Sequence, residues 1–195
     1  MFERSKYHVI LASNSPRRRE LLAGLGIPFE VKVLPDIEER YPGDLPVSQI
    51  AEYIAVEKAE AYKQVMSPDD LIITADTVVI VGDRVLGKPA DAQEAAYMLR
   101  LLSGRTHQVT TGVCITTLHG QSRFSVTTDV TFKSLSSDEI NHYVTFYRPF
   151  DKAGAYGIQE WIGYIGVTGL HGSYFNVMGL PVQRIYAELS KMGVI

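Results

Sequence analysis

The sequence contains little that would anchor the chain in a membrane or cross-link it covalently. Cys114 is the single cysteine among 195 residues, so a disulfide within the chain is excluded and a reducing cytosol is compatible with this count. Cys114 lies in the apolar stretch 113–115, which predicts a buried thiol. Residues 1–6 lack the apolar core of a signal peptide, and no apolar run approaches membrane-spanning length. We therefore expect a cytoplasmic protein with no membrane contact.

Several common signatures of nucleotide-binding and hydrolytic enzymes are also absent. The P-loop pattern Gly-x-x-x-x-Gly-Lys-Ser/Thr does not occur, and no Gly-x-Gly-x-x-Gly follows the first expected strand. The Gly-x-Ser-x-Gly elbow of α/β-hydrolases is missing as well. The five histidines have no metal-ligand spacing. These absences exclude P-loop and Rossmann proteins and argue against an α/β-hydrolase.

Charge of one sign is not in large excess. The chain has 19 Lys and Arg residues against 22 Asp and Glu residues, a formal net charge of −3. Such a chain has no global field that would attract nucleic acid, so we expect no nucleic-acid partner and only a local anion site. With 46% hydrophobic and 21% charged residues, the composition is that of an ordinary globular protein of one domain.

The order of the expected elements predicts an α/β protein. Apolar patterns and turn signals predict strands at 7–12, 29–33, 71–81, 84–86, 107–118 and 122–132, and helices at 16–24, 48–66, 91–102, 136–146 and 181–191. Parallel βαβα units come first, and a long hairpin follows. This order indicates a mixed sheet in one domain, with two lobes and a cleft between them as the binding place.

The start of the first expected helix is the most informative segment. Ser15 is a natural N-cap, and Pro16 suits the first helical position because its missing N–H costs nothing there. Three arginines follow at 17–19, where cations oppose the helix dipole. A bound anion removes this conflict, and a phosphate is the obvious candidate. The alternative is a solvated basic helix start.

Asp76 interrupts the most apolar expected strand, 71–81. A carboxylate in such a strand is costly unless it is paired, hydrogen-bonded or bound to a metal. One interpretation is a metal ligand or a base that activates water. The alternative is an aspartate at a strand end, satisfied by backbone N–H groups.

Further candidates lie outside these two segments. Lys88 follows the short hairpin at a rigid turn, and Lys58 sits on the second expected helix; both are also compatible with surface lysines. The segment 151–159 has small residues that would let the backbone approach a ligand, and its Gln159 offers an amide able to read a base edge. A plain glycine-rich turn is the alternative there.

Taken together, these segments resemble the Maf family of nucleoside triphosphate pyrophosphatases, which share an ITPase-like (HAM1) fold. The resemblance rests on LASNSPRRRELL at 11–22, EKA at 57–59, ADTVV at 75–79, GKP at 87–89, LLSGRTH at 101–107, DKAGAYGIQ at 151–159 and GLP at 179–181. It implies cleavage between the α- and β-phosphates of a nucleoside triphosphate, which yields the monophosphate and pyrophosphate. It also implies a divalent cation, Mg²⁺ or Mn²⁺, and a role in removing non-standard nucleotides.

The resemblance implies particular roles for individual residues. Asp76 would be the catalytic proton acceptor and would hold the metal together with Glu39, for which Glu38 is the alternative. The phosphate-binding residues would be Ser13, Arg17, Arg18, Lys58 and Lys88. Arg17, Thr77 and Gln159 match the three specificity positions of the subgroup that acts on dTTP and UTP, which implies a pyrimidine preference.

An alternative function belongs to another class. The resemblance also allows a nucleotide-binding regulatory module that affects septum formation in cell division without turnover. The sequence leaves the oligomeric state open, with a homodimer as one alternative.

Overall fold

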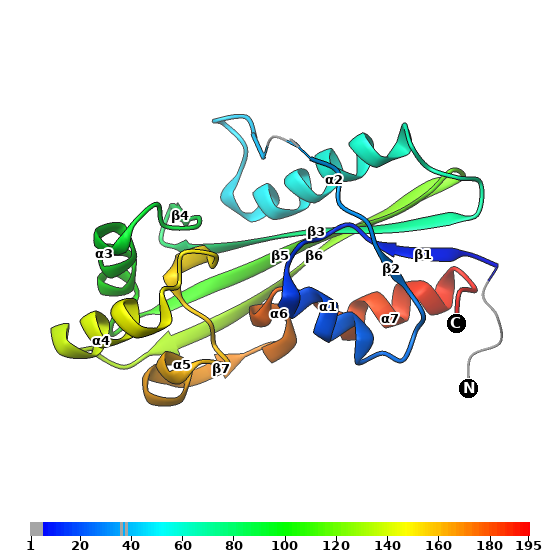
Figure 1. Ribbon diagram of the computed structural model, residues 1–195. Helices are drawn as coiled ribbons and strands as arrows, with labels where there is room; N and C mark the ends of the chain where they lie inside the picture. The colour runs from blue at the N-terminus through cyan, green and yellow to red at the C-terminus, as the bar shows by residue number, and fades with distance from the viewer. Residues whose placement is uncertain (1–5, 36, 38) are drawn as a thin grey trace. The chain divides into compact units, whose positions relative to one another are not determined.

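Each of the two units that make up the structure draws on separated stretches of the chain. The computed structural model describes residues 6–35, 37 and 39–195 (Figure 1). Unit 1 comprises Met1–Asp76, Thr111–Val126 and Gly179–Ile195, and unit 2 comprises Thr77–Thr110 and Thr127–Met178. The prediction of a single domain with one cleft stays a prediction.

The strands of the described residues form one mixed sheet of seven strands in the order β2-β1-β3-β5-β6-β7, with β4 paired to β3. Their bounds are β1 His8–Leu11, β2 Glu30–Val31, β3 Asp70–Val81, β4 Arg84–Leu86, β5 Thr106–Thr117, β6 Gly120–Phe132 and β7 Val167–His171. β1 runs parallel to β2 and β3, whereas β4 is antiparallel to β3 and β7 to β6. The predicted mixed sheet is therefore confirmed.

The expected long hairpin is formed by β5 and β6. The hydroxyl groups of Thr106 and Thr131 lie 2.8 Å apart, and those of Thr110 and Thr127 lie 2.9 Å apart. Residue numbers rise along one strand as they fall along the other, so the two strands are antiparallel. A two-residue turn at 118–119 joins them, so β6 begins two residues before the strand predicted at 122–132.

The helices that follow Ser15, Asp91 and Ser136 begin where the capping signals predict, whereas the helix predicted at 48–66 spans only Ile50–Lys63. Their bounds are α1 Pro16–Ala23, α2 Ile50–Lys63, α3 Ala92–Leu102, α4 Ser137–Tyr147, α5 Trp161–Gly166, α6 Tyr174–Met178 and α7 Val182–Lys191, and a 3₁₀ turn at Val47–Gln49 precedes α2. Asp91 caps α3 by accepting a hydrogen bond from the Glu94 N–H at 2.8 Å. Ser136 and Glu139 form a full capping box on α4. The elements α5, β7 and α6 were not expected, because each is short and lies in a glycine-rich stretch.

Unit 1 packs α2 directly against the sheet. A Cβ atom at Gly112 of β5 would overlap the backbone of Ala51, so the helix approaches the strand as closely as only glycine allows. The Thr74 hydroxyl of β3 donates to the Ala55 carbonyl of α2 at 2.7 Å. Cys114 is buried as predicted, and burial raises the pKa of its thiol. These contacts fix α2 on the strand that carries Asp76.

Unit 2 has its own apolar core. Side chains of α3, α4 and β6, including Leu102, Tyr143 and Phe132, are buried together, and Ile162 of α5 joins them. Within this unit α3 and α4 pack against each other. In the part of the chain that the structure describes, no helix combines the length and apolarity needed to cross a membrane.

Candidate active site

The turn between β1 and α1 has the predicted form. Ser15 has extended backbone angles (φ −66°, ψ 117°), and its hydroxyl accepts from the Arg18 N–H at 3.4 Å, while Pro16 takes the first helical position. The Ser13 hydroxyl accepts from the Ser15 N–H at 3.2 Å, and Ser13 is buried. The turn therefore places Ser13 beside the amino end of α1, where backbone N–H groups favour an anion.

Arg18 links three segments of unit 1. Its Nε donates to the Gly179 carbonyl and its Nη1 to the Ala75 carbonyl, both at 2.8 Å. Burial lowers the pKa of the guanidinium, and the negative charge of Asp76 opposes this shift. Arg18 thus ties the start of α1 to the residue that precedes Asp76. The role of Arg18 in phosphate binding stays a prediction. These two hydrogen bonds also give Arg18 a structural role.

Asp76 lies in the middle of a buried strand. Of the twelve residues of β3, all are buried except Asp76 and Thr77, which are partly exposed. The strand continues for five residues beyond Asp76, so the interpretation of an aspartate at a strand end is wrong. The side chain of Asp76 is 13% exposed, and a carboxylate held there needs a charged or hydrogen-bonding partner.

Lys58 of α2 is the partner of Asp76. Its Nζ lies 2.9 Å from Asp76 Oδ1 and 2.7 Å from Glu39 Oε1, which places one ammonium group between two carboxylates. The Lys58 side chain is 14% exposed, whereas that of Glu39 is 46% exposed. We call these three residues the Asp76 cluster. It carries one positive and two negative charges when all three groups are ionised, so it has an excess negative charge.

Tyr62 positions the segment that leads to Glu39. This buried side chain lies one helical turn after Lys58, and its hydroxyl donates to the Lys32 carbonyl and accepts from the Leu34 N–H, both at 2.9 Å. The chain after β2 is thereby fixed to the helix that carries Lys58. No local sequence pattern predicts this contact, because a tyrosine near the end of a helix can be buried for many different reasons.

The Asp76 cluster fits a divalent cation in its donor chemistry. Mg²⁺ is commonly held by one or two carboxylates together with substrate phosphate oxygens and water, and Asp76 and Glu39 supply two carboxylates that both contact Lys58 Nζ. Among the residues that the structure describes, no group of three or more His, Cys, Asp and Glu side chains is suited to a metal. The described residues thus offer two carboxylates to a metal at the cluster, and substrate phosphate oxygens and water are suited to the remaining positions. Glu38, the alternative ligand, lies outside the described residues.

Three further predicted site residues, Lys88, Thr77 and Gln159, belong to unit 2. Lys88 follows β4 and is exposed, and the carbonyl of its neighbour Gly87 accepts from the Gly154 N–H at 3.0 Å. Gly154 has a φ of 67°, and a Cβ there would meet Val79 at 2.9 Å. The small residues of 151–159 were predicted to let the backbone approach a ligand, and in the structure Gly154 approaches Val79 of β3 instead. The contacts bring the GKP and DKAGAYGIQ segments together.

Gln159 and Thr77 also lie in unit 2, whereas Arg17 lies in unit 1. The Gln159 side chain is partly exposed, but its Oε1 is buried and has no hydrogen-bond partner within residues 6–35, 37 and 39–195. Buried acceptors are usually satisfied, so this oxygen is a candidate for a ligand contact. The joint use of the three specificity residues stays a prediction.

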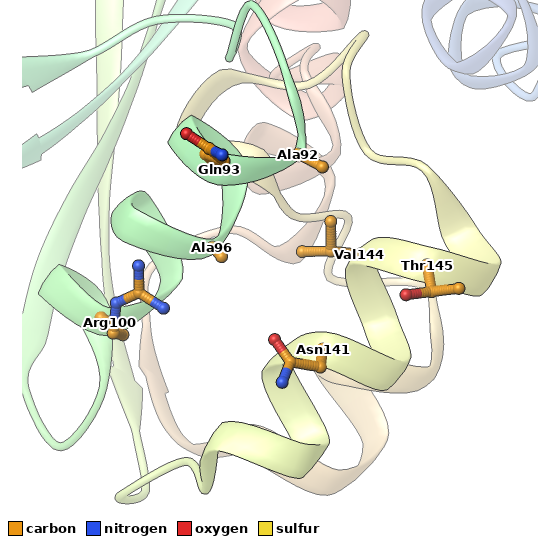
Figure 2. A pocket seen from close by; sticks show the side chains of 7 residues that line it. All are labelled: Ala92, Gln93, Ala96, Arg100, Asn141, Val144 and Thr145. Atoms are coloured by element: carbon orange, nitrogen blue, oxygen red, sulfur yellow. The ribbon is translucent and has the colours of Figure 1, made fainter.

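A cavity of about 450 Å³ lies between α3 and α4 in unit 2 (Figure 2). Its lining includes Ala96 and Arg100 from α3 and Asn141 and Val144 from α4. None of the predicted site residues lines this cavity. Its position therefore gives no support to a nucleotide site there.

The fold of this chain is similar to that of a Ham1 protein. The Ham1 protein of Staphylococcus aureus superimposes with a TM-score of 0.52 at 16% identity, covering 95% of this chain and 99% of that one. A likeness at this identity concerns the fold alone, and it confirms the predicted HAM1-like α/β class.

The sequence comparisons define the family. The family described as Maf-like protein matches residues 8–192, and the chain belongs to the Maf family. A protein of Phocaeicola vulgatus named dTTP/UTP pyrophosphatase is 62% identical over 96% of this chain and 97% of its own. Proteins of the same name in Bacteroides thetaiotaomicron and Flavobacterium psychrophilum are 56% and 46% identical over 96% of this chain and over 97% and 95% of their own. The predicted family is therefore confirmed.

Proposed function

We propose that this chain is a nucleoside triphosphate pyrophosphatase that hydrolyses dTTP and UTP to the nucleoside monophosphate and pyrophosphate. The observation that carries the proposal is the name shared by relatives that are 46–62% identical over 96% of this chain. Modified pyrimidine triphosphates are included in the proposal, since the family is associated with the removal of non-standard nucleotides.

In this reaction water adds across the anhydride between the α- and β-phosphates. Asp76 is the proposed base, because it is a carboxylate fixed in a rigid strand and left partly exposed. It accepts a proton from the attacking water as the phosphorus–oxygen bond to pyrophosphate breaks. Lys58, bound to Asp76 at 2.9 Å, holds the carboxylate in place and lowers the negative charge that an incoming triphosphate meets.

Phosphate binding is assigned to the start of α1. Ser13 and Arg17 offer donors to phosphate oxygens at the positive end of the helix dipole, and Arg18 fixes this end of the helix beside β3. A Mg²⁺ or Mn²⁺ ion held by Asp76 and Glu39 would neutralise phosphate charge and polarise the anhydride. The roles of Lys88, Thr77 and Gln159 in unit 2 stay predictions that follow from the family resemblance.

The test is product analysis with purified protein, Mg²⁺ or Mn²⁺, and a panel of canonical and modified nucleoside triphosphates. Monophosphate and pyrophosphate from dTTP and UTP support the proposal, whereas release of orthophosphate contradicts it. Nucleotide binding without turnover on every substrate would instead favour the regulatory module. Omission of the metal and addition of a chelator test the cofactor separately.

We extend the proposal to the cytoplasm as the site of action, because nucleoside triphosphates are used there. No nucleic-acid partner is proposed, and a binding assay at low salt tests this point. The homodimer stays a prediction, which light scattering of the purified protein would check.

A further inference from the structure

Tyr143, a buried residue of α4, contacts the segment that carries Gln159. Its hydroxyl donates to the Glu160 carboxylate at Oε2 and accepts from the Gly157 N–H at 3.0 Å. Burial and the negative charge of Glu160 raise the pKa of Tyr143, so the hydroxyl keeps its proton and remains a donor. One hydroxyl group therefore holds both the backbone before Gln159 and the side chain after it.

Lys152 holds the other oxygen of the same carboxylate. Its Nζ lies 3.0 Å from Glu160 Oε1 and 2.7 Å from Asp151 Oδ1, and its side chain is only 10% exposed. Both oxygens of Glu160 are thus engaged, one by a cation and one by a phenol. A largely buried carboxylate with two such partners is fixed in orientation, because releasing either partner leaves a poorly solvated charge.

The amide of Gln159 and this network both lie beside Gly157. A Cβ atom at residue 157 would lie 3.0 Å from Glu160 Cδ, 3.1 Å from Lys152 Cε and 3.2 Å from Gln159 Nε2. The Gln159 amide nitrogen therefore packs on the same glycine as the ion pair. The other end of the amide, Oε1, is buried and has no partner among the residues that the structure describes.

We propose that Tyr143, Lys152 and Glu160 are positioning residues that fix Gln159 so that its Oε1 accepts a hydrogen bond from a ring N–H of the substrate base. The inference rests on the proposed function, in which Gln159 reads the base. Uracil and thymine present N3 as a donor, whereas cytosine presents N3 as an acceptor. A fixed acceptor therefore favours binding of uracil and thymine. With cytosine it faces another acceptor, and a buried acceptor without a donor is unfavourable.

The experiment measures kcat and KM for UTP and CTP in wild-type protein and Tyr143→Phe. We expect Tyr143→Phe to reduce the UTP:CTP ratio of kcat/KM by about tenfold, mainly through a higher KM for UTP. Tyr147→Phe is the matched control, because it makes the same change one helical turn later on α4 and its ring stacks on Tyr143 at 5.0 Å. A purely structural role would lower kcat/KM for both nucleotides equally, and that outcome would overturn the inference.

A second variant keeps the inference testable if Tyr143→Phe does not fold. Gly157→Ala adds a methyl group between Glu160 and the Gln159 amide and should also reduce the UTP:CTP ratio of kcat/KM. An unchanged ratio in Gly157→Ala and Gln159→Ala together would overturn the inference while the pyrophosphatase assignment stands. If wild-type protein does not hydrolyse UTP, the proposed function is wrong. In that case calorimetry measures the affinity of wild-type protein for UTP and for CTP. Equal affinities would overturn the positioning role too.

Discussion

Two lysines of this protein bridge two carboxylates each, and the comparison separates a candidate catalytic centre from a structural one. Lys58 in unit 1 lies between Asp76 and Glu39, and Lys152 in unit 2 lies between Glu160 and Asp151. In each cluster one carboxylate is mostly buried and the other is largely exposed, at 13% and 46% in unit 1 and 22% and 58% in unit 2.

The difference lies in what else the buried carboxylate contacts. Both oxygens of Glu160 are engaged, by Lys152 and by the Tyr143 hydroxyl. For Asp76, the hydrogen-bonding side-chain partner among the described residues is Lys58, on Oδ1. A fully engaged carboxylate fixes structure, whereas one with an oxygen left over can bind a proton, a metal or water. Ion-pair composition alone therefore does not distinguish the two functions.

The largest expected effect comes from neutralising the two buried carboxylates in turn. Asp76→Asn should lower kcat by about a thousandfold, since it removes the proposed base, and should leave nucleotide binding in place. Glu160→Gln should retain most of kcat, because its role is to orient Gln159. Steady-state kinetics with UTP and calorimetric nucleotide binding measure both variants.

Asp83→Asn, an exposed change in the turn after β3, is the control for the Asp76 variant. If Asp76→Asn fails to fold while Asp83→Asn folds normally, the aspartate is structural. If Glu160→Gln loses as much kcat as Asp76→Asn, the distinction between the two clusters is wrong.

The core of unit 2 also contains a titratable group that gives it a pH dependence. His107 is buried in edge-to-face contact with the rings of Phe132 and Tyr156. Its Nε2 lies 2.7 Å from the Tyr156 hydroxyl, and burial lowers its pKa to about 4. The unfolded chain therefore binds more protons than the folded one between about pH 6.5 and 4. Stability should be complete above pH 6.5 and fall towards pH 4, by an amount on the order of 3 kcal/mol.

Urea unfolding across this pH range measures the effect. His107→Phe should flatten the dependence, and the exposed His119→Gln should leave it unchanged. An equally steep loss of stability in His107→Phe would assign the pH dependence to other groups.

Removal of each bridging lysine should separate the clusters by their response to metal. Lys58→Met and Lys152→Met each leave a mostly buried carboxylate without its cation, so each should lower the free energy of unfolding by about 2 kcal/mol. Mg²⁺ or Mn²⁺ should restore stability to Lys58→Met, because Asp76 and Glu39 then face a cation without competition. Thermal unfolding with and without metal tests this, and equal rescue of Lys152→Met would contradict it.

The smallest effect concerns two serine N-caps, Ser15 on α1 and Ser136 on α4. Ser15→Ala and Ser136→Ala should each reduce stability by about 1 kcal/mol, since each leaves helix N–H groups without an acceptor. Only Ser15→Ala should also raise KM for UTP, because α1 begins at the proposed phosphate site. Equal KM values in both variants would argue against that site.

Local patterns predicted a large part of the fold. The apolar run at 71–81 corresponds to β3, and the signals at Ser15-Pro16, Asp91 and Ser136 correspond to observed helix starts, because a cap and its N–H partner lie within three residues. The region 161–178 was missed because its helices of six and five residues and its five-residue strand are too short to show periodicity.

The sequence by itself determined that Asp76 stands in an apolar strand, that basic residues begin α1, and that the chain resembles the Maf family. These features are written in neighbouring residues, where composition and spacing are sufficient. Only the tertiary structure decided that Lys58 binds Asp76 and Glu39, and that Tyr143 reaches Glu160 and Gly157. Such pairs are separated by 14 to 19 residues, so packing of helices and loops, which no local pattern encodes, decides which charged groups meet.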